Sequence, residues 1–305
     1  MSKKATKLAF LAAVMCGGIV AESASAAPLG YWRFEQDADA SVTAANGVEI
    51  VEAVSEVNPG LMPGQMNATQ PPSGNEKAPI YSNNVGGAFV YDPVTGLYTA
   101  NSLSMQSPAT MNASDDAQLY ASGSAPTLDE LRDSTFEMFI QITNNGAAAN
   151  MAGSTRIANL DGSNRWNFNV NSNNVNFRVD TASANVASIS EFGSPLEDGE
   201  WHHLAATVAY DEVDNLTTVE LFIDYTSAGS QTAAGVFDPT SYLRFGADGS
   251  DGNLDWFFDE VRISDGVLTS SQFLQLSAVP EPGSFALIGL GAALTLARRR
   301  SVKSA

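Results

Sequence analysis

Apolar and polar residues alternate along several short segments of this chain, and this period of two constrains its fold more than any other feature. In residues 166–170 a tryptophan, a phenylalanine and a valine alternate with two asparagines, and the pattern returns in residues 174–179 after a polar turn at 171–173. Successive side chains on a strand point to opposite faces of a sheet, so each segment has one apolar and one polar face. The pair predicts a β-hairpin.

The same period predicts further strands. They are expected at residues 31–34, 136–142, 201–208, 219–223, 243–246 and 255–263, and short helical turns are expected at 127–131 and 270–276. Residues 201–208 are apolar on both faces, as in a central strand, whereas Phe139 interrupts the polar face of residues 136–142. Many short strands with polar turns, and no long helical period, predict an all-β, two-sheet antiparallel sandwich.

The N-terminus has the three parts of a secretory signal peptide. A basic start at residues 3–7 is followed by the apolar segment Leu8–Val20 and by Ala24-Ser25-Ala26, the small-x-small pattern after which signal peptidase cuts. The alternatives are an uncleaved anchor, for which the apolar segment is short, and a lipoprotein at Cys16, for which the preceding Met15 is too bulky. Cleavage after residue 26 removes the only cysteine, so the exported protein has no disulfide to stabilise it.

The C-terminus has a second set of ordered signals. Val279-Pro280-Glu281-Pro282 is followed by an apolar run, Phe285–Ala297, and by Arg298-Arg299-Arg300. The 13 apolar residues would form a helix about 20 Å long, which is short against a hydrocarbon core of about 30 Å. The arginines should stay on the cytoplasmic side, with the preceding chain outside. The tail is therefore either a single-pass anchor or a sorting signal that a membrane protease cuts.

This tail resembles the PEP-CTERM sorting signal, because the Val-Pro-Glu-Pro motif, the short apolar helix and the arginine cluster occur in the order of that signal. The resemblance implies export in a Gram-negative type of envelope, transient membrane insertion, and processing by an exosortase as well as by signal peptidase. It divides the chain into a signal peptide (1–26), a body (27–278) and a sorting signal (279–305).

The body is strongly acidic. The whole chain has 15 Lys and Arg against 34 Asp and Glu, a net charge of −19. Seven of the basic residues but only two of the acidic ones lie in the two terminal signals, so the body keeps eight basic and 32 acidic residues, a net charge of −24. Such a surface repels nucleic acid and anionic polysaccharide and favours cations. Nucleic-acid binding is therefore excluded as a function.

Three motifs of the body resemble LamG-like jellyroll domains of the concanavalin A-like lectin and glucanase fold. They are Tyr31-Trp32-Arg33-Phe34-Glu35 at the start, Gly199-Glu200-Trp201-His202-His203-Leu204-Ala205 in the middle, and Leu243-Arg244-Phe245-Gly246 with Phe258-Asp259-Glu260-Val261-Arg262-Ile263 at the end. The resemblance implies two antiparallel sheets in jellyroll order. It leaves the function open, because this fold contains binding modules, adhesion domains and enzymes.

The residues give little support for catalysis. His202 and His203 are the only histidines, and as neighbours on a strand they point to opposite faces, so they cannot bind one metal together. Glycoside hydrolysis needs two carboxylates beside the scissile bond. Glucanases of this fold carry a Glu-x-Asp-x-Glu cluster on one strand, and this sequence lacks it. A noncatalytic module is therefore expected, with a polysaccharide-active hydrolase or lyase as the alternative.

A structural calcium ion is the one cofactor that the sequence suggests. The oxygen-rich segment Asp248–Asp255 is not an EF-hand, because it lacks glycine at the sixth position. The LamG-like resemblance instead implies an ion that joins the first strand to the last. The matching residues are Glu35, Asp37 and Asp259. The alternative is that these carboxylates are simply solvated or hydrogen-bonded.

The polar face of the predicted hairpin is the candidate glycan-binding surface, because amide groups both donate hydrogen bonds to hydroxyls and accept them. Its residues are Asn167, Asn169, Asn174, Asn176 and Arg178. The tryptophans are expected mainly in the core. The sequence thus predicts an exported binding or structural protein that recognises neutral glycan or another surface protein. The alternative for this face is a solvated outer surface without a ligand. The alternative for the chain is a purely structural or adhesive protein.

Overall fold

The computed structural model of the chain describes most of the predicted body. The described residues are 26–36, 41–56, 65–67, 76–107, 116–121, 131–143, 155–160, 166–171, 174–181, 186–192, 196, 198–237, 243–248 and 255–277. All but the last residue of the predicted signal peptide, and the whole predicted sorting signal, lie outside them. Within the described residues, no helix is both long and apolar enough to cross a membrane.

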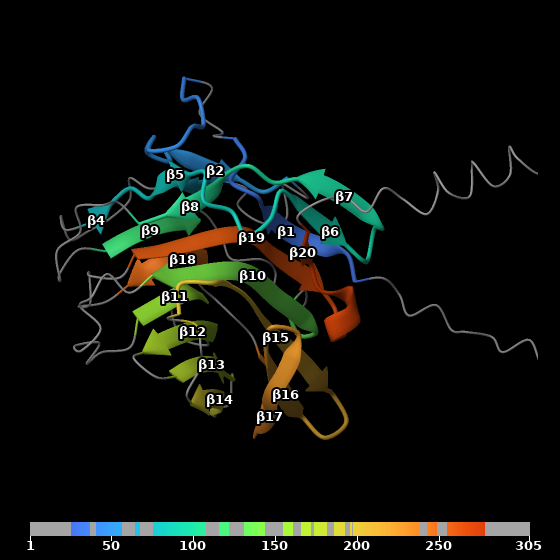
Figure 1. Ribbon diagram of the computed structural model, residues 1–305. Helices are drawn as coiled ribbons and strands as arrows, with labels where there is room; N and C mark the ends of the chain where they lie inside the picture. The colour runs from blue at the N-terminus through green and yellow to red at the C-terminus, as the bar shows by residue number, and fades with distance from the viewer. Residues whose placement is uncertain are drawn as a thin grey trace, which may run out of the picture.

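The strands form two large sheets and one small sheet (Figure 1). The first sheet has the order β17 (Thr226–Ala234), β16 (Leu216–Ile223), β15 (Trp201–Asp211), β10 (Ser134–Thr143), β19 (Asp255–Asp265), β8 (Ser104–Gln106) and β5 (Ile80–Ser82), and β1 (Pro28–Trp32) pairs with β19. The second sheet has the order β14 (Val186–Phe192), β13 (Asn174–Asp180), β12 (Trp166–Asn171), β11 (Thr155–Leu160), β18 (Leu243–Asp248), β9 (Asp116–Ala121), β3 (Gln65–Asn67) and β2 (Glu52–Val54), and β4 (Glu76–Lys77) pairs with β9. The small sheet is β20 (Gln275–Ser277), β6 (Phe89–Asp92) and β7 (Leu97–Ala100).

These sheets confirm the all-β sandwich, and all the described strand pairs are antiparallel except β4 with β9. The predicted hairpin is the β12–β13 pair, in which Trp166 lies opposite Val179 and Phe168 lies opposite Phe177. Its apolar residues face the first sheet, where the rings of Phe136 and Trp166 have centroids 4.3 Å apart. The inter-sheet core includes the buried side chains of Trp32, Phe136, Ile140, Trp166, Phe168, Phe177, Leu204, Val219, Leu221, Phe245, Trp256, Phe258 and Ile263.

The outer face of the first sheet is also covered, which the sequence did not predict. The small sheet packs there, and Phe139 of β10 joins Val90 of β6 and Leu274 in a buried cluster. A second cluster joins Ala205 of β15 to residues 222, 268 and 273. This covering explains why Phe139 interrupts the polar face of its strand, and why the segment 201–208 is apolar on both faces.

Two expectations from the sequence need correction. The helical turn expected at 270–276 is the 3₁₀-helix η4 (Ser270–Gln272), and the chain then extends into β20, where Leu276 lies opposite Val90. Trp201 is only half-buried and lies on the outer face, with its ring centroid 6.2 Å from that of Phe257, whereas the other three tryptophans are in the core. Of the turn expected at 127–131, only the last residue is described.

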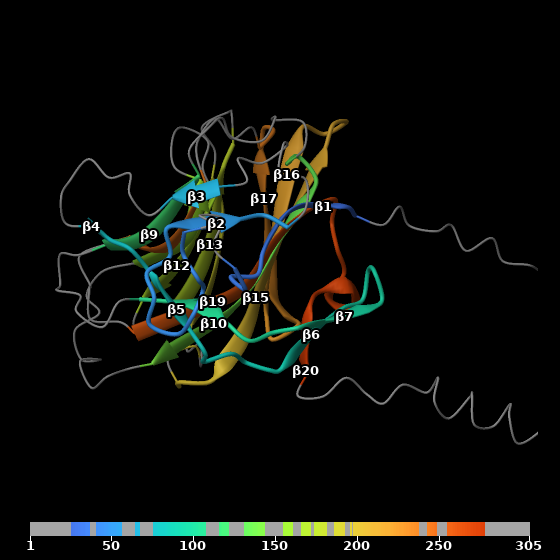
Figure 2. The same cartoon turned by 90° about the horizontal axis from the view of Figure 1, so that it is seen from above.

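In both views the small sheet lies at one side of the molecule, away from β12 and β13 (Figures 1 and 2). Tyr31 of β1 packs against the cluster beneath it. The described chain leaves the fold there, because β20 ends at Ser277. The predicted sorting signal therefore follows the small sheet directly.

Candidate functional site

A β-bulge in β19 sets the positions of the charged residues under the small sheet. The register between β10 and β19 shifts where Glu137 pairs with Arg262 and Phe139 pairs with Asp259. The extra residue lies in β19, and Glu260 has a positive φ of 53°. A bulge interrupts the alternation of side chains between the two faces. Asp259 and Glu260 can therefore both reach the end of β7 although they are adjacent in β19. Asp259 bonds to Asn101, and Arg33, the partner of Glu260, bonds to the Ala100 carbonyl.

Asp259 is fully buried and has an incomplete set of hydrogen bonds. Its Oδ2 accepts a hydrogen bond of 2.8 Å from the Asn101 side-chain amide, which lies just after β7. The Oδ1 of Asp259 and the Oδ1 of Asn101 are buried with no hydrogen-bond partner among the described residues. Burial, and next the charge of Glu260, raise the pKa of Asp259 well above its usual value. Two buried acceptor oxygens, one on each residue of this hydrogen-bonded pair, therefore lack a donor among the described residues.

Glu260 lies beside this pair and has better partners. Its carboxylate accepts a hydrogen bond of 3.1 Å from Arg33 Nε and another from the Tyr31 hydroxyl. Burial raises the pKa of Glu260 to about 7, although Arg33 acts in the opposite direction. Burial and the neighbouring Glu260 carboxylate in turn raise the pKa of Tyr31. These contacts fix the start of the described chain to β19.

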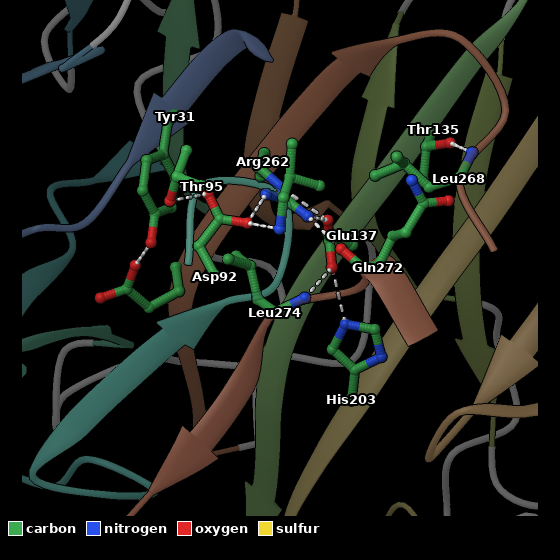
Figure 3. Close-up of polar contacts among 12 residues, drawn as sticks. Tyr31, Asp92, Thr95, Thr135, Glu137, His203, Arg262, Leu268, Gln272 and Leu274 are labelled. Atoms are coloured by element: carbon green, nitrogen blue, oxygen red, sulfur yellow. Dashed lines mark hydrogen bonds and ion pairs between the residues drawn. The ribbon is translucent and has the colours of Figure 1, made fainter. Parts of the chain in front are cut away.

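Glu137 is the centre of a second buried cluster on the same outer face (Figure 3). Its Oε1 accepts a hydrogen bond of 2.6 Å from Arg262 Nε, and its Oε2 lies 3.0 Å from His203 Nε2 and accepts 2.9 Å from the Leu274 backbone N–H. Arg262 extends the cluster with an ion pair of 2.9 Å to Asp92 and a bond of 3.0 Å to the Gln272 carbonyl. The cluster thus joins β10, β15 and β19 to β6 and to the C-terminal segment.

This cluster keeps Glu137 charged in a fully buried position. Burial opposes ionisation, but Arg262, His203 and the Leu274 N–H outweigh it, and the pKa of Glu137 is lowered. The His203 ring also stacks on Tyr225, with centroids 4.6 Å apart and an interplanar angle of 8°. The Tyr225 hydroxyl donates 3.1 Å to the Leu274 carbonyl. Both backbone groups of Leu274 are therefore held by side chains, one from β10 and one from the turn between β16 and β17.

His202 has a separate environment, as the alternation of a strand requires. Its Nδ1 lies 2.8 Å from Asp224 and its Nε2 lies 3.1 Å from Asp198. Burial disfavours protonation, but the hydrogen bonds with Asp224 and Asp198 outweigh it and raise the pKa of His202. The two histidines share no ligand-like site. Within the described part of the chain, no group of three or more His, Cys, Asp or Glu side chains could hold a metal ion.

The candidate glycan residues lie on β12 and β13, on the face away from the core. Asn167 is buried, and Asn169 and Asn176 are half-buried. The Asn169 amide donates 2.7 Å to Asn167 and 3.2 Å to Asn176, and the Asn176 amide donates to Ser188 and to the Ile189 carbonyl. The three asparagines form an amide ladder on β12 and β13, and its hydrogen bonds continue to β14. Arg178 pairs with Asp180 at 2.6 Å, and the side chain of Asn174 lies outside the described structure.

The candidate calcium residues are divided between described and undescribed parts of the chain. Asp259 and Glu35 are both described, and the Glu35 carboxylate accepts hydrogen bonds from the backbone N–H groups of Ser102 (2.7 Å) and Leu103 (3.2 Å). Asp37 lies outside the described residues. Asn101, which the sequence did not single out, contacts Asp259 directly. No sequence motif marks Asn101, because the fold brings it to β19 from 158 residues away.

Two family models match the chain. The model described as the concanavalin A-like lectin/glucanases superfamily matches residues 113–272, more than half of the chain. The PEP-CTERM protein-sorting motif matches residues 278–301. These matches confirm both resemblances inferred from the sequence. The comparison with curated proteins gives no match.

Similar solved structures include three binding domains. The binding domain of paraclostridial mosquitocidal protein 1 is 14% identical, with a TM-score of 0.46 over 68% of this chain and 47% of that chain. The receptor binding domain of botulinum neurotoxin type G is 11% identical, with a TM-score of 0.46 over 81% and 49%. The serotype D binding domain is 11% identical, with a TM-score of 0.48 over 81% and 50%. This chain spans about half the length of each.

We predict that Arg262→Met strongly destabilises the protein. The substitution leaves the Glu137 carboxylate buried without its main cationic partner, and breaking a buried ion pair in this way costs about 3–5 kcal/mol. Urea denaturation should measure the loss. The matched control is Arg132→Met, because Arg132 pairs with Glu212 at 3.5 Å on the surface and such pairs contribute about 1 kcal/mol or less. Equal losses for the two variants would contradict a central role for the Glu137 cluster.

We also predict that His202 makes stability depend on pH. The folded-state pKa of His202 is raised, so its contribution is fully present below the unfolded pKa of about 6.5 and is lost as pH rises through the folded value. The melting temperatures of the wild type and of His202→Gln should therefore differ more at pH 5 than at pH 9. A difference that stays constant between these pH values would show that protonation of His202 adds no stability.

Proposed function

Because the chain belongs to the concanavalin A-like lectin/glucanases superfamily and carries a PEP-CTERM protein-sorting motif, we propose that it is an exported surface protein whose β-sandwich is a noncatalytic binding module. The observation that carries the proposal is the order of the two parts. The last described strand, β20 of the small sheet, ends at Ser277, and the match to the sorting motif begins at residue 278. The described part of the body therefore ends where the match to the sorting motif begins.

The sorting motif supports a defined route to the surface. Signal peptidase removes residues 1–26, the tail inserts transiently in the membrane, and an exosortase processes it. The recognition elements are Val279-Pro280-Glu281-Pro282 and Arg298-Arg299-Arg300. The protein then remains in the envelope or extracellular matrix of a Gram-negative type of cell.

The amide ladder on β12 and β13 supports neutral glycan as the ligand. Asn169 and Asn176 are fixed by hydrogen bonds to neighbouring side chains and backbone. Each amide has two N–H groups and a carbonyl with two lone pairs, so an ordered amide can contact a sugar hydroxyl while it keeps a bond to its neighbour. Asn174 and Arg178 would extend the surface along β13. A surface protein is the other ligand that such a polar face could bind.

The partners of the buried carboxylates support a noncatalytic role. Glu137 and Glu260 are each held by an arginine, and Asp259 by Asn101. A glycoside hydrolase needs two carboxyl groups about 5–10 Å apart that reach the substrate, and these three are buried beneath the small sheet. The alternative remains a polysaccharide-active enzyme whose acidic residues lie elsewhere in the chain.

The unpartnered oxygens of Asp259 and Asn101 support a structural calcium ion, because the amide oxygen adds a ligand to the described acidic side chains, which by themselves form no group of three. Calcium takes oxygen ligands from carboxylates and amide carbonyls, and the Oδ1 atoms of Asp259 and Asn101 are buried acceptors without a partner in the described structure. Glu35 lies close enough to influence the pKa of Asp259. We propose that these three residues, with Asp37, hold the ion. It would neutralise buried negative charge and fix the segment after β7 to β19.

We predict that the full chain binds neutral oligosaccharides through the amide ladder. Each lost hydrogen bond weakens binding by about 0.5–1.5 kcal/mol, so the combined variant Asn169→Ala with Asn176→Ala should bind roughly fivefold or more weakly. A glycan array followed by calorimetry with the best ligand measures this effect. Asn83→Ala, at an exposed asparagine outside the ladder, is the control. Binding that is unchanged in the combined variant would place the ligand elsewhere, and no binding to any glycan would favour a protein ligand.

We predict that calcium raises the melting temperature and that Asp259→Asn abolishes this rise. A ligand at 100 times its Kd stabilises the folded state by about 2.7 kcal/mol. Without calcium, Asp259→Asn should be as stable as the wild type or more stable, because it removes a buried charge. Glu212→Gln, at an exposed carboxylate, should respond to calcium like the wild type. Identical melting of the wild type in calcium and in excess chelator would rule out the site.

A further inference from the structure

The small sheet has an exposed apolar edge at the side where the chain leaves the fold. Leu97 and Tyr98 of β7 are 62% and 42% exposed, which makes them two of the five exposed large hydrophobic residues of the described structure. Among the described strands, β7 pairs only with β6. The Tyr98 ring packs on Tyr91, with centroids 4.6 Å apart. Proteins usually protect such an edge with charge, proline or a covering segment, and β7 itself has neither a charged residue nor a proline.

The position of this edge is fixed relative to the sorting signal. Ser277 lies opposite Phe89, and Tyr98 lies opposite Tyr91. Two strand spacings of about 4.8 Å, and two residues of about 3.4 Å along the strand, separate Ser277 from Tyr98 by about 12 Å. Residues 278–284, between Ser277 and the apolar run that starts at Phe285, can span at most about 25 Å. While the apolar run is inserted, the small sheet must therefore stay near the membrane surface.

The charge distribution also favours this side of the body. The three strands of the small sheet contain one charged residue, Asp92, which is paired with Arg262. Among the described residues, the most exposed large hydrophobic side chain is Val213 (92%), which lies instead in an acidic turn with Asp211, Glu212 and Asp214. A membrane surface with anionic lipids repels acidic groups, so a body with a net charge of −24 is better placed with the small sheet toward the lipid than with this acidic turn.

We propose that β7 contacts the lipid–water interface while the sorting tail is still attached, with Leu97 and Tyr98 as the contact residues. The interface suits these side chains, because tyrosine combines an apolar ring with a polar hydroxyl and is enriched at membrane surfaces. The contact orients the body so that residues 278–284 run directly into the membrane, where a membrane protease can reach them. This inference rests on the proposed membrane insertion of the tail.

Site-specific fluorescence on the exported form of the chain, residues 27–305, tests the contact. This form has no cysteine of its own, so Leu97→Cys and Val213→Cys are made separately, labelled with an environment-sensitive fluorophore, and reconstituted in phosphatidylcholine vesicles. Without the apolar segment Leu8–Val20, the C-terminal tail is the segment expected to insert. The label at position 97 should shift to the blue and should be quenched when the lipids carry bromine on their acyl chains. The label at position 213 should show neither effect, because it lies in the acidic turn.

Flotation of the vesicles separates the possible failures. If the chain floats with the vesicles but the label at position 97 is not quenched, the lipid contact is wrong and the inserted tail remains. A blue shift without quenching by brominated lipid would mean that a second copy of the chain covers β7, which also overturns the lipid contact. If the chain does not float, the tail does not insert, and both the proposed membrane step and this inference fail.

Discussion

The ion pair between Glu137 and Arg262 makes the double covering of the first sheet possible. A charged residue on a sheet normally faces water, and its burial costs several kcal/mol unless a partner compensates it. Here each charge compensates the other, with Arg262 Nε 2.6 Å from Glu137 Oε1. The other donors and acceptors of the two side chains bond to the segments that cover the sheet. Glu137 accepts from the Leu274 N–H, and Arg262 donates to the Gln272 carbonyl and to Asp92. The pair therefore specifies which segments cover the face and in what register.

The bulge in β19 produces a second group of buried charges a few residues away, and this group is less complete. Arg33 compensates Glu260, whereas Asp259 has only one amide and keeps an oxygen without a partner in the described structure. The difference between the two clusters is physically informative. A lowered pKa at Glu137 shows a carboxylate with enough donors, and a raised pKa at Asp259 shows one with too few. A proton on the Asp259 carboxyl group would remove the imbalance, and so would the proposed calcium ion.

The sequence predicted the parts of the fold that depend on local periodicity. The β12–β13 hairpin and the apolar face of β10 follow from the alternation of apolar and polar residues. Burial of one face of a strand is enough to produce this alternation in the sequence. The small sheet could not be predicted in this way, since its strands have three or four residues and show no measurable period. Phe139 was the visible sign of the covering. The contact of Asn101 with Asp259 was also out of reach, because a bulge and a pairing between distant segments create it.

The segment 266–277 links the stability of the body to the position of the sorting signal. Its backbone is held at Gln272 by Arg262 and at Leu274 by Glu137 and Tyr225, and its last three residues pair with β6. Tyr225 takes a left-handed φ of 65° in the turn that reaches Leu274, a conformation that is strained for a bulky residue. The fold accepts this strain in a turn that fixes the segment before the sorting motif. The last described strand is therefore tied to the buried ion pair of the first sheet as well as to β6.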